Sequence, residues 1–241
     1  MRAYELKNKA YHFLFICSIT LTSSYSFGQN IHDQKVLTYK DAVNTIDTAV
    51  FGSLALVEID NDTLMLAFQK ALSYYPELWD KKIKLKYGKV KTSMTSRPRI
   101  LSVFRKRDKR LYKITISNKK DYKPALLVNT APFNALVGVL GHELAHVEDY
   151  SNRSGWAVTW MGIRYVFSQK YRSQMEHYTD SLAMSKGLQW QVYHYAYYVV
   201  NDADIDESYR RYKLNIYMPP EQVRDLAVKL DSLQNINVLQ K

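Results

Sequence analysis

The sequence predicts an α+β fold: a first helix, then a small antiparallel and basic sheet, then a bundle of helices. Lysines alternate with apolar residues over Lys82–Tyr87, and this period of two residues is that of a β-strand with one solvent-exposed face. After Pro132 the apolar residues recur at helical spacing instead. Strands and helices do not alternate along the chain, so a parallel βαβ layout is not expected.

The first 29 residues have the layout of a secretory signal peptide. A basic start precedes the apolar run Phe13–Leu21 and a small polar stretch that ends at Gln29. The only cysteine, Cys17, lies in this segment, so the mature chain is expected to lack disulfides and zinc thiolates. No later segment reaches about 18 uninterrupted apolar residues, so no integral membrane segment is expected there. We therefore predict an exported protein, periplasmic or secreted, with one domain over residues 30–241.

Positive charge is concentrated in one part of the chain. Residues 81–123 contain 17 of the 34 Lys and Arg residues, opposed only by Asp108 and Asp121. Such a block could contact an anionic surface. The alternation within Lys82–Tyr87 favours a solvated sheet face instead, and a nucleic-acid partner is not expected.

The elements of the first half follow from local signals. A helix is expected around Lys40–Phe51, and another runs from Asp62 to Tyr75, where Pro76 stops it. The strands are expected in four places: Lys82–Met94 with a break near Gly88, a hairpin of Ile100–Lys106 and Arg110–Ser117, and Ala125–Asn129.

The second half is expected to be helical. The predicted helices are Phe133–Tyr150, a segment around Trp156–Phe167, Tyr171–Gly187, Trp190–Val200, and a last one that opens at Pro219-Pro220. In the second of these, Trp156, Trp160, Ile163 and Phe167 fall near helical spacing, and an apolar stripe of this kind predicts a face packed into the core.

The motif His142-Glu143-Leu144-Ala145-His146 reads HExxH and lies on a predicted helix. Residues four apart share a helix face, so His142 and His146 can present two imidazole nitrogens to one metal ion. Glu143 is placed to reach a water on that metal rather than the metal itself. Two ligands, a base and an open coordination position are what a hydrolytic zinc site needs.

A third ligand is required, and the sequence narrows where it lies. Asp149 and Asn152 stand where an HExxHxxGxxH motif would have glycine and histidine, so that motif is absent. A di-iron carboxylate bundle would need a second ExxH, which the chain lacks. Farther on, Glu176 and Asp180 are four apart on a predicted helix. Glu176 can therefore bind the metal while Asp180 accepts a proton from a ligand imidazole.

HExxH followed by ExxxD resembles the gluzincin metallopeptidases, and is nearest the group of the heat-shock membrane protease and the CAAX prenyl proteases. The resemblance covers residues 110–225 loosely and lacks that group's transmembrane helices. It implies a zincin-like fold and a zinc-dependent endopeptidase acting on polypeptide substrates. His142, His146 and Glu176 would bind one Zn²⁺ per chain, with Glu143 as general base. The strand Tyr112–Ile116 looks like the zincin edge strand, which pairs with extended substrate.

The donor that would stabilise the oxyanion is left open. Tyr217–Arg224 is similar to that group's His-Pro segment, but Met218 stands where the family has histidine. The candidate donors are His194, Tyr217 or another of the many tyrosines. Two other functions stay open: a non-catalytic zincin-like protein that binds anionic surfaces, and a zinc hydrolase acting on a non-peptide amide. Glu143 argues against the first, because zinc binding alone does not require that carboxylate.

Overall fold

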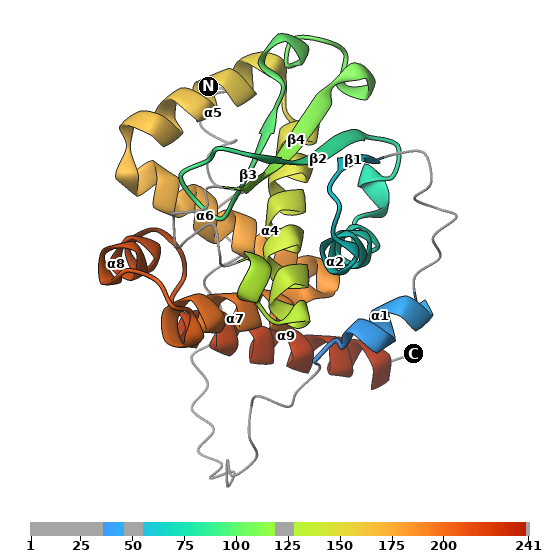
Figure 1. Cartoon of the computed structure of the whole chain (residues 1–241), viewed down its shortest axis with the longest axis vertical. Coiled ribbons are helices and arrows are strands. Elements are labelled where there is room, and N and C mark those ends of the chain that lie inside the picture. The colour runs from blue at the N-terminus through green and yellow to red at the C-terminus, as the bar shows by residue number, and fades with distance from the viewer. Residues whose placement is uncertain (1–35, 46–54, 119–127, 240–241) are drawn as a thin grey trace, which may run out of the picture. The chain divides into compact units, whose positions relative to one another are not determined.

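The computed structural model describes residues 36–45, 55–118 and 128–239 (Figure 1). All of these belong to one compact unit, Asp33–Lys241. The predicted signal peptide, residues 1–29, lies outside the described residues. So does most of the predicted strand Ala125–Asn129, and residues 128–130 are helical.

The sheet has four strands in the order β1-β2-β4-β3. They are β1 (Ala55–Glu58), β2 (Lys82–Gly88), β3 (Met94–Pro98) and β4 (Leu111–Ser117). β1 pairs with β2, and β2 with β4, in parallel; only β3 and β4 are antiparallel. A mixture of helices with this small sheet agrees with an α+β class, but the antiparallel sheet that we predicted is wrong.

The parallel pairs arise from two connections. Helix α2 (Asp62–Leu72) joins β1 to β2, and a crossover of this kind makes the two strands parallel. It starts at Asn61, whose side chain accepts the Leu64 N–H. After β2 the chain forms β3 at the edge and returns as β4 between them. The sequence did not predict β1, which is only four residues long.

The predicted hairpin is present with a different first strand. Its true first strand is β3, where Ser96 pairs with Ile114, whereas Ile100–Ser102 forms one helical turn. The Ser102 hydroxyl accepts the Leu111 N–H at 3.1 Å, which holds this segment as a turn. β4 is therefore an inner strand, so Tyr112–Ile116 is not the edge strand that we predicted. β3 occupies that edge and lies against helix α4 (Phe133–Asn152).

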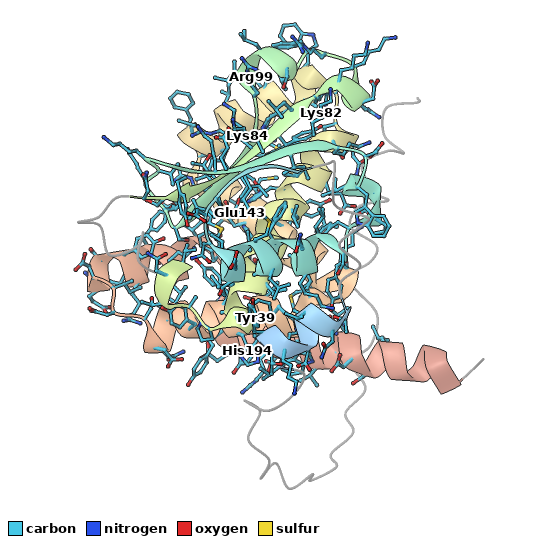
Figure 2. All side chains as sticks on the ribbon, turned by 45° about the vertical axis from the view of Figure 1, so that its right-hand side comes forward. Tyr39, Lys82, Lys84, Arg99, Glu143 and His194 are labelled. Carbon is cyan, nitrogen blue, oxygen red and sulfur yellow. The ribbon has the colours of Figure 1, made fainter. Side chains whose placement is uncertain are left out.

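One face of the sheet is buried and the other is basic. Ile83, Leu85 and Ile114 are buried on the inner face. Lys82 and Lys84 lie on the other side of the sheet from Glu143 (Figure 2). The prediction of a strand with one wet face is confirmed for β2.

Helix α4 runs through the middle of the unit, where it packs against α2, β3 and the later helices (Figure 1). It is buried on nearly all sides, both along its largely apolar first half and along its second half, which carries the polar residues of the motif. The other helices are α1 (Tyr39–Thr45), α5 (Gly155–Phe167), α6 (Gln169–Ala183), α7 (Gln189–Tyr197), α8 (Glu207–Ile216) and α9 (Pro220–Leu239). Gly187 separates α6 from α7 with a φ of 102°, which confirms it as a helix stop.

The apolar stripe of α5 is not part of the core, contrary to our prediction. Trp156, Trp160 and Phe167 are 77, 62 and 84 % exposed. α5 instead buries Val158 and Met161, which lie between the stripe residues in sequence. None of the helices in the described ranges is both long and apolar enough to cross a membrane.

Gly138 allows α4 to approach α7 closely. A Cβ at this position would lie 2.0 Å from the carbonyl oxygen of Gln191. We expect Gly138→Ala to lower the free energy of unfolding by about 1–3 kcal/mol, because one of the two helix backbones must shift. Urea unfolding measures this change. Gly162→Ala is the control, since its Cβ would meet nothing within 4 Å, and it should leave stability unchanged or slightly higher. Equal stability of the two variants would contradict this packing.

Candidate metal centre

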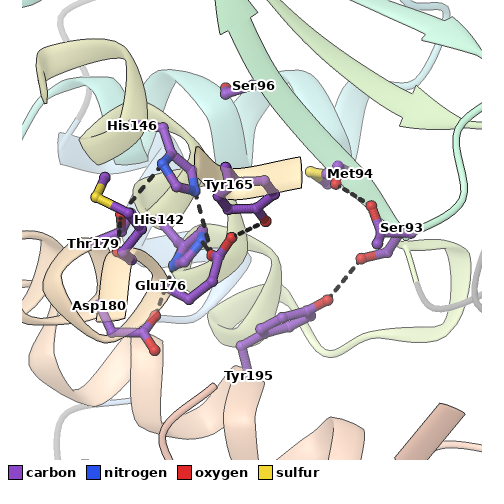
Figure 3. Close-up of polar contacts among 12 residues, drawn as sticks. Ser93, Met94, Ser96, His142, His146, Tyr165, Glu176, Thr179, Asp180 and Tyr195 are labelled. Carbon is purple, nitrogen blue, oxygen red and sulfur yellow. Dashed lines mark hydrogen bonds and ion pairs between the residues drawn. The ribbon is translucent and has the colours of Figure 1, made fainter. Parts of the chain in front are cut away.

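Two helices bring the predicted ligands together. His142 and His146 lie on one face of α4, and Glu176 reaches them from α6 (Figure 3). α5 makes the return between α4 and α6, and the Ser168 side chain starts α6 by accepting the Tyr171 N–H. One ligand atom from each of the three residues lies within 4.8 Å of the others. These three buried side chains could therefore hold a metal ion.

The ligand atoms converge on one carboxylate oxygen. His142 Nε2 lies 3.0 Å from Glu176 Oε2, and His146 Nε2 lies 3.4 Å from the same atom. Both imidazoles thus turn the same ring nitrogen toward Glu176.

Each imidazole is held through its other nitrogen. Asp180 Oδ1 lies 2.7 Å from His142 Nδ1, as predicted for a carboxylate that orients a ligand histidine. Thr179 Oγ1 lies 3.2 Å from His146 Nδ1 and donates its only proton to the Met175 carbonyl. It must therefore accept from His146 Nδ1–H, so Nε2 is the ring nitrogen that remains available to a metal.

Two residues that support the candidate ligands, Thr179 and Tyr165, were not predicted from the sequence. Thr179 is three residues after Glu176, so its helical spacing could have indicated it. Tyr165 donates its hydroxyl to Glu176 Oε1 from a different helix, α5. No spacing rule within one helix could have found that contact.

The charges of the cluster are strongly coupled. Burial alone would lower the pKa of His142, but the carboxylates of Asp180 and Glu176 outweigh it and raise the pKa to about 10. Burial alone would raise the pKa of Glu176, yet the two imidazoles hold it well below its usual range. Acidic groups therefore surround the point where the ligand atoms meet, which is the environment that a cation needs.

One oxygen of the Glu143 carboxyl group lacks a hydrogen-bond donor among the described residues. Its Oε2 is buried, and no residue in the described part of the chain gives it a hydrogen bond. Burial raises the pKa of this carboxyl group, against the opposing effect of the two histidines. A buried acceptor is costly unless a donor reaches it. A water bound to a metal at the neighbouring ligands would supply that donor, so the residues fit the metal.

A cavity opens beside the cluster. His142, Glu143 and Asp180 line one side of it, and much of the remaining wall is apolar. The other lining residues come from the start of β3 and the chain before it, from α4, from α7 and the turn after it, and from the end of α8 and the chain after it: Thr92, Ser93, Met94, Gly138, Val139, Val192, Tyr195, Ala196, Val199, Val200, Lys213, Leu214, Tyr217 and Met218.

Tyr217 and a buried cation face this cavity. The Tyr217 ring lies 5.8 Å from the His142 ring, centroid to centroid. Burial raises the pKa of Tyr217 well above its usual value, so its hydroxyl keeps the proton and can donate it. Lys213 Nζ sits 3.5 Å from the centroid of the Tyr217 ring. Nothing in the sequence distinguished Lys213 from the other lysines.

His194, the second candidate donor, does not line the cavity. Its neighbours Tyr195 and Ala196 do, and Figure 2 shows His194 well away from Glu143. Successive residues on a helix point about 100° apart, so turning Tyr195 into the cavity turns His194 aside. The Tyr195 hydroxyl instead makes a hydrogen bond of 2.8 Å with Ser93 Oγ.

Comparisons with protein-family models, curated proteins and solved structures gave no match to this chain. Its function is therefore inferred from its own residues and their geometry.

Proposed function

We propose that this chain is an exported zinc metalloendopeptidase of the gluzincin type. One observation carries the proposal. Three buried ligand atoms of His142, His146 and Glu176 meet beside a buried carboxylate, Glu143, at the wall of a cavity. Two histidines and one glutamate are a ligand set of catalytic zinc sites, which keep one position open for water.

The residues around the metal would have separate tasks. When bound, zinc brings the pKa of its water to about 7 and polarises a carbonyl group. Glu143 Oε2 would take the proton of the attacking water and later return it to the leaving amine. Asp180 and Thr179 orient the two imidazoles. Tyr217 is better placed than His194 as the donor for the oxyanion, since its ring lies beside that of His142 and its hydroxyl stays protonated.

A polypeptide substrate is supported by the edge of the sheet. β3 ends the strand order and lies against α4, and its first residue, Met94, lines the cavity. An extended peptide can add to such an edge through backbone hydrogen bonds, which places its carbonyl groups along the strand. The proposed substrate-binding edge is therefore β3, in place of Tyr112–Ile116.

Removal of the metal tests this proposal. We expect the purified chain to cleave unfolded casein, 1,10-phenanthroline to abolish the cleavage, and one equivalent of zinc to restore it. The reason is that the protein residues alone provide no group that activates water as strongly as a metal ion does. Cleavage that persists after the metal is removed would contradict the proposal.

The same assay separates the two other functions. Chelator-sensitive hydrolysis of an N-acyl amide without cleavage of casein or peptides would favour a non-peptide hydrolase. Bound zinc with neither activity would favour a non-catalytic binding protein.

A further inference from the structure

Exposed apolar side chains gather at one end of the unit. The described chain has fifteen large apolar residues that are exposed, and eight of them lie in two segments, the loop 99–109 and α5. Singly scattered apolar residues are ordinary on a protein surface, but a concentration of this kind marks an interaction site. The eight are Ile100, Leu101, Phe104, Trp156, Trp160, Ile163, Val166 and Phe167.

The two segments form one surface. The rings of Phe104 and Trp156 are in edge contact with centroids 5.3 Å apart. Gly155, the first residue of α5, lies so close to the loop that a Cβ would be 2.6 Å from the Val103 carbonyl oxygen. Figure 1 shows the turns between β3 and β4 beside α5. The spacing of Trp156, Trp160 and Phe167 puts them on one face of that helix.

Cations surround these apolar residues. The loop 99–109 carries five exposed basic residues and one acidic residue, Asp108. No ion pair within the described ranges engages the basic side chains of this loop. They are Arg99, Arg105, Lys106, Arg107 and Lys109. We call these five cations and the eight apolar residues the docking surface.

The cationic character continues onto the outer face of the sheet. Arg97 lies opposite Lys113 on the neighbouring strand, and Lys113 lies beside Lys84. Lys84 pairs with Glu58 of β1, whereas no ion pair among the described residues engages Arg97 or Lys113. Like charges on adjacent strands repel each other, so Arg97 and Lys113 favour an anion nearby. A partner that complements both this positive charge and the exposed tryptophans is anionic and also apolar.

We propose that the docking surface binds the interface of an anionic lipid bilayer. The thirteen residues of α5 are about 20 Å long, shorter than the roughly 30 Å hydrocarbon core, so the helix would lie in the interface rather than cross it. Tryptophan and phenylalanine side chains enter the boundary between headgroups and acyl chains. The loop cations contact the lipid phosphates. This inference does not depend on the proposed peptidase activity.

Co-sedimentation of the full chain with lipid vesicles tests the proposal. We expect binding to phosphatidylcholine vesicles that contain about 30 % phosphatidylglycerol, weak binding to phosphatidylcholine alone, and a loss of binding as salt rises from about 0.1 to 0.5 M. Tryptophan emission should shift to shorter wavelength on binding, because the rings leave water. Binding that is equally strong to the neutral vesicles would overturn the role of the cations.

Two double variants probe the two parts of the surface. Trp156→Ser/Trp160→Ser and Lys106→Glu/Arg107→Glu should each weaken vesicle binding by about tenfold or more. All four residues are exposed, so the thermal unfolding midpoint should not fall. The matched controls lie on α9: Val228→Ser/Leu233→Ser for the apolar change and Lys229→Glu for the charge. These should bind like the unchanged chain.

Two outcomes would overturn the proposal. In one, the tryptophan variant binds vesicles as well as the unchanged chain does, so no apolar insertion occurs. In the other, the unchanged chain ignores vesicles but is a dimer by light scattering, and the tryptophan variant is a monomer. The surface would then be covered by a second copy of this chain.

Discussion

Replacing Glu143 by glutamine should lower peptidase activity by about 10²–10⁴-fold and leave the metal content unchanged. The substitution keeps the size of the side chain but removes the carboxylate that would accept a proton from the attacking water. Glu143 Oε2 has no hydrogen-bond partner within the described chain, so the change breaks no hydrogen bond at that oxygen. Casein hydrolysis and elemental analysis of the same preparation measure the two quantities.

Glu148→Gln is the matched control for this experiment. It changes a carboxylate on the same helix that is also buried, but Glu148 pairs with Lys186 at 2.9 Å and does not line the cavity. Its activity should equal that of the unchanged chain, apart from any loss of stability seen in thermal unfolding. Full activity of Glu143→Gln would refute its role as the base. Loss of metal from that variant would instead make Glu143 a ligand.

The second large effect concerns metal binding. We expect about one zinc ion per chain, and none in His146→Ala, because two remaining ligands hold the ion too weakly to survive dialysis. The unchanged chain should also lose thermal stability on chelation. A ligand that binds only the folded state at a thousandfold excess over its Kd contributes about 4 kcal/mol. His146→Ala should show no such response to a chelator.

Two further variants compare zinc binding after changes beside the candidate ligands. His177→Ala is the control, since His177 follows the candidate ligand Glu176 directly but makes its side-chain contact with Ser173, outside the cluster. It should keep its zinc. Asp180→Asn should weaken zinc binding by about 10–100-fold, as expected for a residue that orients a ligand histidine. Zinc retained in His146→Ala, or iron found in place of zinc, would contradict the proposed site.

Local patterns predicted the elements that have a clear period. The helices that carry the two motifs are α4 and α6, and both lie where apolar spacing and end signals put them. β2 was recognised because lysines alternate with apolar residues, which are buried in the structure. β1 and β3 were not recognised as separate strands, since each is only four or five residues long and neither shows the alternation of apolar and polar residues that marks β2.

The errors concern how elements pack. Ile100–Lys106 has the apolar composition of a strand, but Ser102 ties it to β4 as a turn. The stripe on α5 has the spacing of a core face, yet Trp156 and Phe167 are exposed. Periodicity shows that a helix has an apolar face; it does not show whether another element of the same chain covers that face.

The sequence by itself predicted which side chains form the candidate metal site. The spacing of His142 and His146, and of Glu176 and Asp180, places each pair on one helix face, because the helix period is set by backbone hydrogen bonds alone. Only the tertiary structure decided which helices meet. It brought Tyr165 and the cavity with Lys213 to the candidate ligands, made β3 the edge, and left the apolar stripe of α5 exposed. These outcomes depend on packing between segments far apart in the chain, which no local period specifies.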